Sequence, residues 1–196
     1  MDIAHLSRHG KLVAIAAIFC LAAPSVVLAG TGNANFFLGG KALNKSDWEP
    51  LEDQAEFGAE VTFGRDGWPV SVAIDVLGSA TEETESGIDF EGRTSELCVG
   101  VRKIWEVNRT RPYIGGGIAL VTAEFEGDVS GVNISDDDNG IGAWIGGGVF
   151  WRLGSRFNLG IAARYSKAEV TLFGADGEAG GTHAGILLGW GWPASK

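Results

Sequence analysis

Seven ionisable residues lie within segments that otherwise alternate small and apolar side chains, and these are the residues whose types could do chemistry. They are Glu56, Glu60, Asp75, Glu96, Arg102, Arg164 and His183. Brought together, such groups form ion pairs, relay protons or, beside a hydroxyl group, activate a nucleophile. Charges in a poorly solvated interior are costly unless they are paired and hydrogen-bonded. We therefore expect an internal ionic network with Arg102 and Arg164 among the carboxylates. It would serve as structural packing or, alternatively, as a gate or proton path.

Histidine-based catalysis would depend on His183, because the other two histidines, His5 and His9, precede residue 30. A serine on another strand could complete a Ser–His pair, since such sites are defined by geometry rather than by sequence position. We interpret His183 as an interior hydrogen-bonding partner. The sequence accordingly predicts no catalytic residues and no enzyme activity.

An acidic run, Asp136-Asp137-Asp138-Asn139-Gly140, invites comparison with calcium-binding loops. An EF-hand loop places oxygen ligands at alternate positions, with a glycine sixth and a distant glutamate. Gly140 stands where the third ligand is needed, so the pattern does not match. We interpret the run as part of a solvated loop and predict no metal site and no cofactor.

Composition excludes two further classes of protein. The formal net charge is −10 at pH 7, and no basic stripe is interleaved with stacking aromatics, so nucleic acid is not an expected partner. Cys98 is the only cysteine after residue 29. A lone thiol cannot cross-link its own chain, which excludes a disulfide-stapled scaffold.

The segments that would position the ionisable residues alternate with a period of two, which predicts β-strands. This pattern gives eight strands, at residues 35–43, 54–63, 70–76, 96–102, 113–125, 141–151, 157–166 and 182–192. The two glycine-heavy segments, 113–125 and 141–151, do not reveal which face is apolar. No helical period stands out after residue 29, so the fold class is all-β.

The connections between these strands alternate in length. Short turns fall at 64–68, 106–109 and 153–155, whereas long acidic loops fall at 44–53, 80–92, 126–139 and 172–181. Short turns on one rim and long loops on the other are typical of an up-and-down membrane barrel. We therefore predict an eight-stranded antiparallel transmembrane β-barrel with a basic rim of arginines at the short turns: Arg65, Arg109, Arg111, Arg152 and Arg156.

The two faces of the predicted strands indicate which side meets lipid. The side chains opposite the apolar set are largely Gly, Ala and Ser, which suits the narrow interior of an eight-stranded barrel. Aromatic residues cluster near the short turns, as in the girdle of a membrane barrel at the lipid–water interface: Phe63, Trp68, Trp105, Tyr113, Trp151, Phe157, Trp190 and Trp192. A soluble lipocalin-like barrel, with the apolar positions lining a ligand cavity, is the alternative.

The N-terminus reads as a secretory signal. Arg8 and Lys11 precede an apolar run at 12–23, and the small-residue site Val27-Leu28-Ala29 comes before Gly30. The run is shorter than the ~20 residues of a membrane helix. We predict a signal peptide at residues 1–29 and a single barrel domain at residues 30–196.

Two motifs carry a resemblance to a known family. The segment Arg111-Pro112-Tyr113-Ile114-Gly115-Gly116-Gly117 and the closing Gly189-Trp190-Gly191-Trp192 resemble the small outer-membrane β-barrel family that includes the OmpA transmembrane domain and OmpX. The tail at 193–196 departs from the family, whose last strand usually stops at an aromatic residue. The resemblance implies the bacterial outer membrane as location. It also implies contact with outer-membrane lipid and lipopolysaccharide, insertion by the barrel-assembly machinery, and a monomeric state.

A fold does not give a function, so several functions stay open. The preferred one is a non-enzymatic barrel with a structural or surface-interaction role, long acidic loops outside and a largely plugged polar lumen. The alternatives are a small pore, a soluble binding barrel and a lipid A-modifying enzyme. The deacylase family of such enzymes carries a serine two residues after its histidine, whereas this chain has Gly185 there.

Overall fold

A computed structural model describes residues 30–192, except 66, 86–87 and 130–131. The predicted signal peptide at residues 1–29 and the tail at 193–196 lie outside the described residues. Within the described ranges, no helix is long and apolar enough to cross a membrane.

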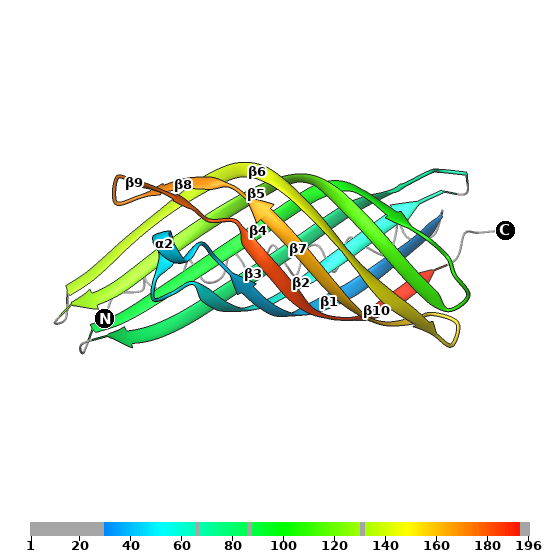
Figure 1. Cartoon of the computed structure of the whole chain (residues 1–196), viewed down its shortest axis with the longest axis horizontal. Helices are drawn as coiled ribbons and strands as arrows, with labels where there is room; N and C mark the ends of the chain where they lie inside the picture. Colours follow the sequence, from blue (N-terminus) through cyan, green and yellow to red (C-terminus); the bar gives the residue numbers. More distant parts are fainter. Residues whose placement is uncertain (1–29, 66, 86–87, 130–131, 193–196) are drawn as a thin grey trace, which may run out of the picture.

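Eight strands form one closed antiparallel barrel (Figure 1). They are β1 (Thr31–Ala42), β2 (Asp53–Gly64), β3 (Ser71–Glu85), β4 (Ile88–Ile104), β5 (Thr110–Val129), β6 (Val132–Leu153), β7 (Phe157–Lys167) and β10 (Gly181–Trp192). Each strand pairs with the next along the barrel, and β1 pairs with β10 to close it, with Phe36 opposite Leu188. The predicted eight-stranded up-and-down barrel is confirmed.

Burial alternates along each strand in the sense of a membrane barrel. On β10, His183 and Leu187 are buried, whereas the outward Ile186, Leu188 and Trp190 are exposed. The outward face is thus apolar, whereas the interior holds charged and polar side chains together with some apolar ones, the reverse of what a soluble sheet shows to water. The register is fixed by this pattern, because a slip of one residue would turn every charged side chain outward.

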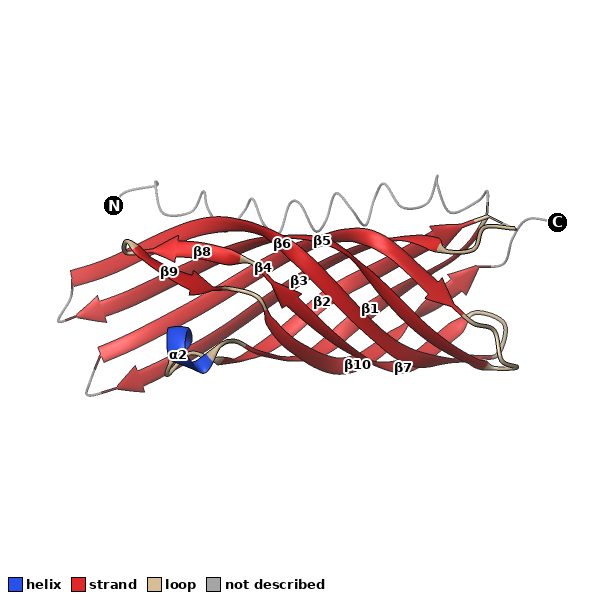
Figure 2. Ribbon diagram, turned by 45° about the horizontal axis from the view of Figure 1, so that its top comes forward, coloured by secondary structure: helices blue, strands red, loops and turns tan. Residues whose placement is uncertain are grey.

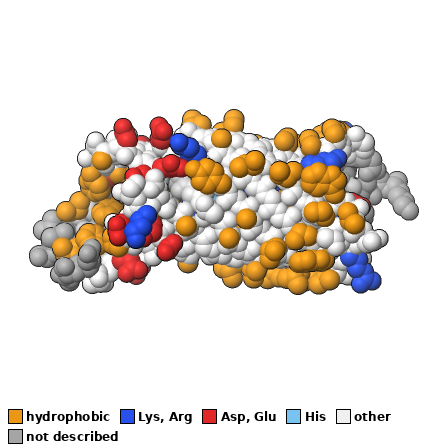
Figure 3. All heavy atoms as spheres, in the orientation of Figure 1, with side chains coloured by type: hydrophobic (Ala, Val, Ile, Leu, Met, Phe, Trp, Pro, Cys, Tyr) orange, Lys and Arg blue, Asp and Glu red, His pale blue; other side chains and the backbone are white. Residues whose placement is uncertain are grey.

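Exposed apolar side chains form a belt around the barrel, and Figure 3 shows groups of them along the face in view. Its members are Phe36, Leu38, Phe57, Val99, Val101, Ile114, Ile118, Leu120, Ile141, Ile145, Leu159, Ile161, Ile186 and Leu188. The 11 residues of β7 match the ~9–11 residues that a tilted strand needs to cross a bilayer. The belt therefore has the position and extent of a lipid-facing surface.

The four central strands extend far beyond the belt at one end (Figure 1). β5 has 20 residues and β6 has 22. Segments 80–92 and 126–139, predicted as loops, are instead mostly strand, and pairs such as Glu82 with Glu91 continue the ladder. Their acidic composition suggested loops. However, a hairpin that grows from a folded barrel needs only its backbone hydrogen bonds to continue, so it tolerates polar side chains on both faces.

A small cap lies at this long-hairpin end, formed by α2 (Lys45–Trp48) and the hairpin of β8 (Glu169–Leu172) with β9 (Ala175–Glu178) (Figure 2). Asn44 begins α2 as its N-cap and accepts a hydrogen bond from Ser46 N. Trp48 Nε1 donates to the carbonyl oxygen of Glu178 at 2.8 Å. The cap covers an apolar cluster that includes Leu43, Trp48 and Val170.

Candidate functional site

All seven ionisable residues expected inside the barrel are buried there. Glu56 and Glu60 come from β2, Asp75 from β3, Glu96 and Arg102 from β4, Arg164 from β7 and His183 from β10. Each has 7% exposure or less. Hydrogen bonds and ion pairs across the interior connect these side chains into groups, which we describe as layers.

The first layer joins two arginines to two carboxylates. Arg102 donates from Nη1 to Glu60 Oε2 at 2.9 Å and from Nη2 to Asp75 Oδ2 at 2.8 Å. Arg164 Nη2 lies 3.4 Å from Glu60 Oε1 and also bonds Asp75 Oδ2. The two cations and two anions alternate, so each charge has oppositely charged neighbours, which buried ions require.

Two aromatic rings pack against this layer. The Arg102 guanidinium lies 4.8 Å from the centre of the Tyr113 ring, and that of Arg164 lies 4.6 Å from Trp144. Tyr113 was predicted to belong to the outer aromatic girdle, and that prediction is wrong: its side chain is only 7% exposed and points inward. The glycine-rich sequence after Tyr113 hides the alternation, whereas its pairing opposite Ile104 and Gly148 sets the face.

The second layer is built around a lysine that the sequence analysis did not single out. Lys41 Nζ donates to Glu96 Oε1 at 2.7 Å, to Thr94 Oγ1 at 2.8 Å and to the Ala179 carbonyl at 2.9 Å. Its side chain is fully buried. The alternation along the strand could have predicted this inward position, because Lys41 falls on the same face of its strand as Asn35 and Phe37. A lysine near the end of a strand, however, is usually interpreted as a water-exposed residue at the end of the barrel.

His183 joins the second layer to a serine and a glutamate. Its Nδ1 lies 2.8 Å from Glu56 Oε1, and its Nε2 lies 3.0 Å from Ser166 Oγ. This order of contacts is that of a Ser–His–acid triad. Ser166 Oγ also lies 3.0 Å from Glu96 Oε1, and its single proton can serve only one of the two acceptors. All three side chains are buried.

A third layer, of amides, lies toward the short turns. Asn158 Nδ2 donates to Asn35 Oδ1 at 2.8 Å and to Asn33 Oδ1 at 3.2 Å. Arg152 closes the group by donating from Nε to Asn158 and from Nη2 to Asn33, each at 2.7 Å. None of the three asparagines was singled out from the sequence.

A cavity of about 10 Å³ lies beside the arginine layer, with Arg102, Trp144 and Arg164 in its wall. Such a volume holds about one water molecule. The nearby atoms Asp75 Oδ1, Arg102 Nε and Arg164 Nη1 make no hydrogen bond to a described residue, so this is where an ordered water would be bound.

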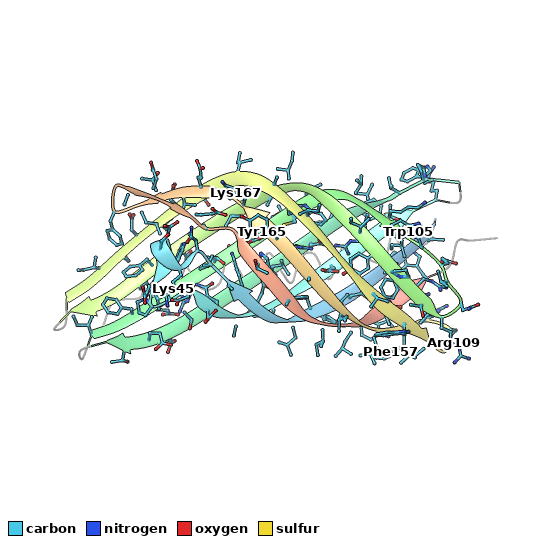
Figure 4. The ribbon with its side chains drawn as sticks, in the orientation of Figure 1. Lys45, Trp105, Arg109, Phe157, Tyr165 and Lys167 are labelled. Carbon is cyan, nitrogen blue, oxygen red and sulfur yellow. The ribbon has the colours of Figure 1, made fainter. Side chains whose placement is uncertain are left out.

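The remaining girdle residues lie on the outside, near the short turns. Trp68, Trp105, Trp151, Phe157 and Trp190 are exposed, and Phe63 and Trp192 are half-buried. Figure 4 shows Trp105 and Phe157 at the short-turn end, far from Lys45 at the cap. Phe36 and Trp190 meet edge to face, with ring centres 6.3 Å apart.

The acidic run on β6 has a structural role. Asp138 Oδ2 accepts a hydrogen bond from Thr171 N at 2.6 Å, and Asp136 Oδ2 accepts one from Phe173 N at 2.5 Å. These carboxylates hold β8 against β6 where the regular ladder ends. Over the described part of the chain, no group of three or more His, Cys, Asp or Glu side chains could hold a metal ion.

The sequence matches no protein-family model and no curated protein. Solved structures do resemble the chain. The attachment invasion locus protein Ail of Yersinia pestis, crystallised with the heparin analogue sucrose octasulfate, matches with a TM-score of 0.61 at 13% identity, covering 84% of this chain and 99% of that one. Neisserial surface protein A matches at 0.52 and 13%, covering 82% and 93%. The outer membrane protein OprG from Pseudomonas aeruginosa matches at 0.50 and 13%, covering 85% and 97%.

At these identities the likeness concerns the fold. The chain has the fold of small bacterial outer-membrane β-barrels, and the resemblance expected from its closing strand is confirmed at that level. The fold alone leaves the function to be argued from the interior and the surface.

Proposed function

We propose that this protein is an outer-membrane β-barrel whose role is structural or surface-interacting, with a lumen closed to solutes. The observation that carries the proposal is the set of side chains that cross the interior: three hydrogen-bonded layers lie one after another, and the cavity beside the arginine layer has a volume of only about 10 Å³. A hydrated ion needs a continuous path, and these layers interrupt it.

The outer-membrane location is supported by the apolar belt and the aromatic side chains at its short-turn edge. The first test compares boiled and unboiled samples of the outer-membrane fraction by electrophoresis in detergent. We expect a heat-dependent shift in mobility, as for a closed barrel. An unshifted band in the soluble periplasm would overturn the proposal and favour the lipocalin-like binding barrel.

The long acidic hairpins are the surface that we assign to the cell exterior. Figure 3 shows most of the visible acidic side chains at that end, together with some Lys or Arg, whereas the charged side chains seen at the short-turn end are mainly Lys or Arg. Lipopolysaccharide carries phosphates, so a divalent cation would have to bridge it to these carboxylates. Sidedness is tested by labelling intact cells with a membrane-impermeant maleimide. Asp176→Cys on β9 should react and Ser155→Cys at a short turn should not; the opposite pattern would reverse the orientation.

Conductance in planar bilayers separates the closed barrel from a pore. We expect no current above leak for the wild-type protein, because the Arg102 and Arg164 ion pairs and the cap stand in the path. A steady single-channel current that changes in Arg102→Ala would establish a pore instead. Assembly as a monomer through the barrel-assembly machinery is part of the proposal, and native mass spectrometry of the purified protein tests the oligomeric state.

An acyl hydrolase is the second candidate, because Ser166, His183 and Glu56 contact one another in the order of a catalytic triad. Burial of all three argues against it, since an acyl chain cannot reach Ser166 Oγ. The test is the mass of lipid A in cells with and without the protein. An unchanged mass supports the non-enzymatic proposal. A change that is abolished in both Ser166→Ala and His183→Ala would establish the enzyme.

A further inference from the structure

A cavity of about 320 Å³ opens at the short-turn end of the barrel, and we refer to it as the vestibule. Its volume lies at the lower end of the ~300–1,000 Å³ typical of small-molecule sites. Residues from the ends of six strands and from the turns between them line it, among them Asn33, Arg152 and Phe150. Its position is opposite the cap, on the side that the proposed orientation assigns to the periplasm.

The vestibule is blind. Phe150 stands in its wall with 1% exposure, and Tyr113 packs against Phe150 with ring centres 6.1 Å apart. The arginine layer lies next to Tyr113. A solute that enters from the short-turn end thus meets a packed aromatic floor rather than a channel, so the vestibule has the form of a binding pocket.

Positive charge dominates its lining. Among the described residues that line it, four cationic side chains, Arg65, Lys103, Arg111 and Arg152, accompany one carboxylate, Glu106. Glu106 lies 3.5 Å from Arg111 Nε, and its side chain is 76% exposed. A single, largely solvated carboxylate leaves most of this positive charge unbalanced, in a chain whose net charge is −10.

Several donors in the vestibule remain available. Arg152 is oriented by its bonds to Asn33 and Asn158, which hold the guanidinium at the wall. Arg111 Nη1 donates to the carbonyl oxygens of Asn108 and Thr110, whereas its buried Nε makes no hydrogen bond to a described residue and has only the ion pair with Glu106. Arg65 has no hydrogen bond or ion pair with any described side chain. Lys103 Nζ donates to the Pro69 carbonyl at 2.7 Å, which holds its charge at the wall without neutralising it. Two cations held in place beside a third, Arg65, without a described partner are an arrangement that suits an anion.

The geometry points to a phosphate group as the ligand, and we propose that the vestibule binds phosphate-bearing molecules. Arginine guanidinium groups match phosphate oxygens in bidentate pairs, and several around one pocket can share its charge. Trp68 and Trp192 add an apolar rim, which suits a phosphate ester that carries carbon atoms. The phosphate could belong to a phospholipid headgroup of the surrounding leaflet or to a free phosphomonoester. Only the lipid source rests on the proposed membrane location.

The test uses the full-length purified protein in a zwitterionic detergent, titrated with inorganic phosphate and with glycerol 3-phosphate by calorimetry. The double variant Arg65→Gln/Arg111→Gln removes two charges from the vestibule. The control Arg109→Gln/Arg156→Gln removes the same charge from the same rim, at residues that do not line the cavity. We expect the vestibule variant to bind at least about tenfold more weakly and the control to bind like the wild type.

A parallel arm identifies the source of the phosphate. Each protein is reconstituted with phosphatidylglycerol and phosphatidylcholine and then measured by native mass spectrometry. If the ligand is a lipid, the wild type and the control variant should retain phosphatidylglycerol, and the vestibule variant should lose it. Binding of soluble phosphate alone assigns the site to a free ester. The proposal would be overturned if the wild type bound neither soluble phosphate nor phosphatidylglycerol, or if the control variant lost binding as much as the vestibule variant. The heat-dependent electrophoretic mobility checks that each variant is folded. If the protein proved not to lie in the outer membrane, the titrations with soluble phosphate would still test the vestibule.

Discussion

At the scale of single residues, the barrel interior depends on the pairing of opposite charges. Lys41 has three oxygen partners, and Glu96 accepts from both Lys41 and Ser166. Removing one partner from such a pair leaves the other charge buried alone, which is more destabilising than replacing both. The layers therefore behave as units rather than as sums of separate bonds.

Lys41→Met should lower the free energy of unfolding by about 3–5 kcal/mol, because Glu96 loses its countercharge in the interior. Urea unfolding in lipid vesicles, followed by the gel-mobility shift, measures the change. The double variant Lys41→Met/Glu96→Leu should recover part of the loss. Lys45→Met is the matched control, because the Lys45 side chain is 69% exposed where it pairs with Glu49 and Glu52. Equal destabilisation by both lysine variants would contradict the role assigned to Lys41.

How far the interior was predictable follows from the strand pattern. Where apolar residues alternate clearly, as around Glu56 and Glu60, the pattern alone identified the inward side chains. Lys41 and Ser166 were missed because a period of two assigns a face without revealing the partner across the barrel. Tyr113 was placed on the wrong side because glycines carry no side chain from which a face can be read.

At the scale of elements, the cap is the least extensive unit of structure. It consists of the four residues of α2 and the four-residue strands β8 and β9. Asp47 Oδ2 accepts from Glu178 N at 3.0 Å, which joins its two halves. Elements with so few contacts open more readily than the strands of a closed barrel, so the cap should respond to local changes without loss of the fold.

Trp48→Ala should open the cap while leaving the barrel folded. The change removes a buried side chain and its bond to the Glu178 carbonyl, a type of truncation that typically costs about 3–5 kcal/mol. Limited trypsin digestion should then cleave faster after Lys45 and Lys167, whereas the heat-dependent gel shift should persist. Trp105→Ala, at an exposed tryptophan of the short-turn end, should show wild-type cleavage. Loss of the gel shift in Trp48→Ala would mean that the cap is required for the barrel itself.

Acid should loosen β8 from β6. The hydrogen bonds that Thr171 N and Asn139 N donate to the Asp138 carboxylate, which lies beyond the apolar belt, hold its pKa below the usual value. The ionised form therefore stabilises the contact, which is present above the ordinary aspartate pKa of about 3.9 and is lost as the pH falls through the lowered value. Hydrogen-exchange protection of Thr171 N should fall in that window. Asp138→Asn keeps an acceptor oxygen without a charge. In this variant the hydrogen-exchange protection of Thr171 N should not fall over that pH range.

The lengths of the central strands could not be predicted from the sequence. Segments such as 80–92 lack an apolar face, and the sequence pattern detects strands through that face. The ladder continues there because β3 and β4 already lie in register within the barrel, so each added pair needs no new loop closure. The strands that cross the belt, in contrast, were identified because lipid on one side imposes the alternation.

At the scale of the whole molecule, the belt makes stability depend on depth in the bilayer. Ile161 lies on the outer face of β7, between Val149 and Ile186. Ile161→Arg should destabilise the barrel by about 2–4 kcal/mol, the cost of an arginine facing lipid near the midplane. Phe157→Arg, at the short-turn end of the same strand, should cost about 1 kcal/mol or less. Urea unfolding in vesicles measures both, and equal effects would contradict a membrane-embedded belt.

The position of the cap in the chain determines when the mouth of the barrel closes during assembly. α2 follows the first strand and the β8–β9 hairpin precedes the last one, so the bond from Trp48 to Glu178 joins residues 130 positions apart. α2 and the β8–β9 hairpin therefore come together only when β1 pairs with β10. An assembly intermediate in which β1 and β10 are not yet paired is therefore open at the cap end. Pairing of these two strands brings α2 and the β8–β9 hairpin together and covers that end.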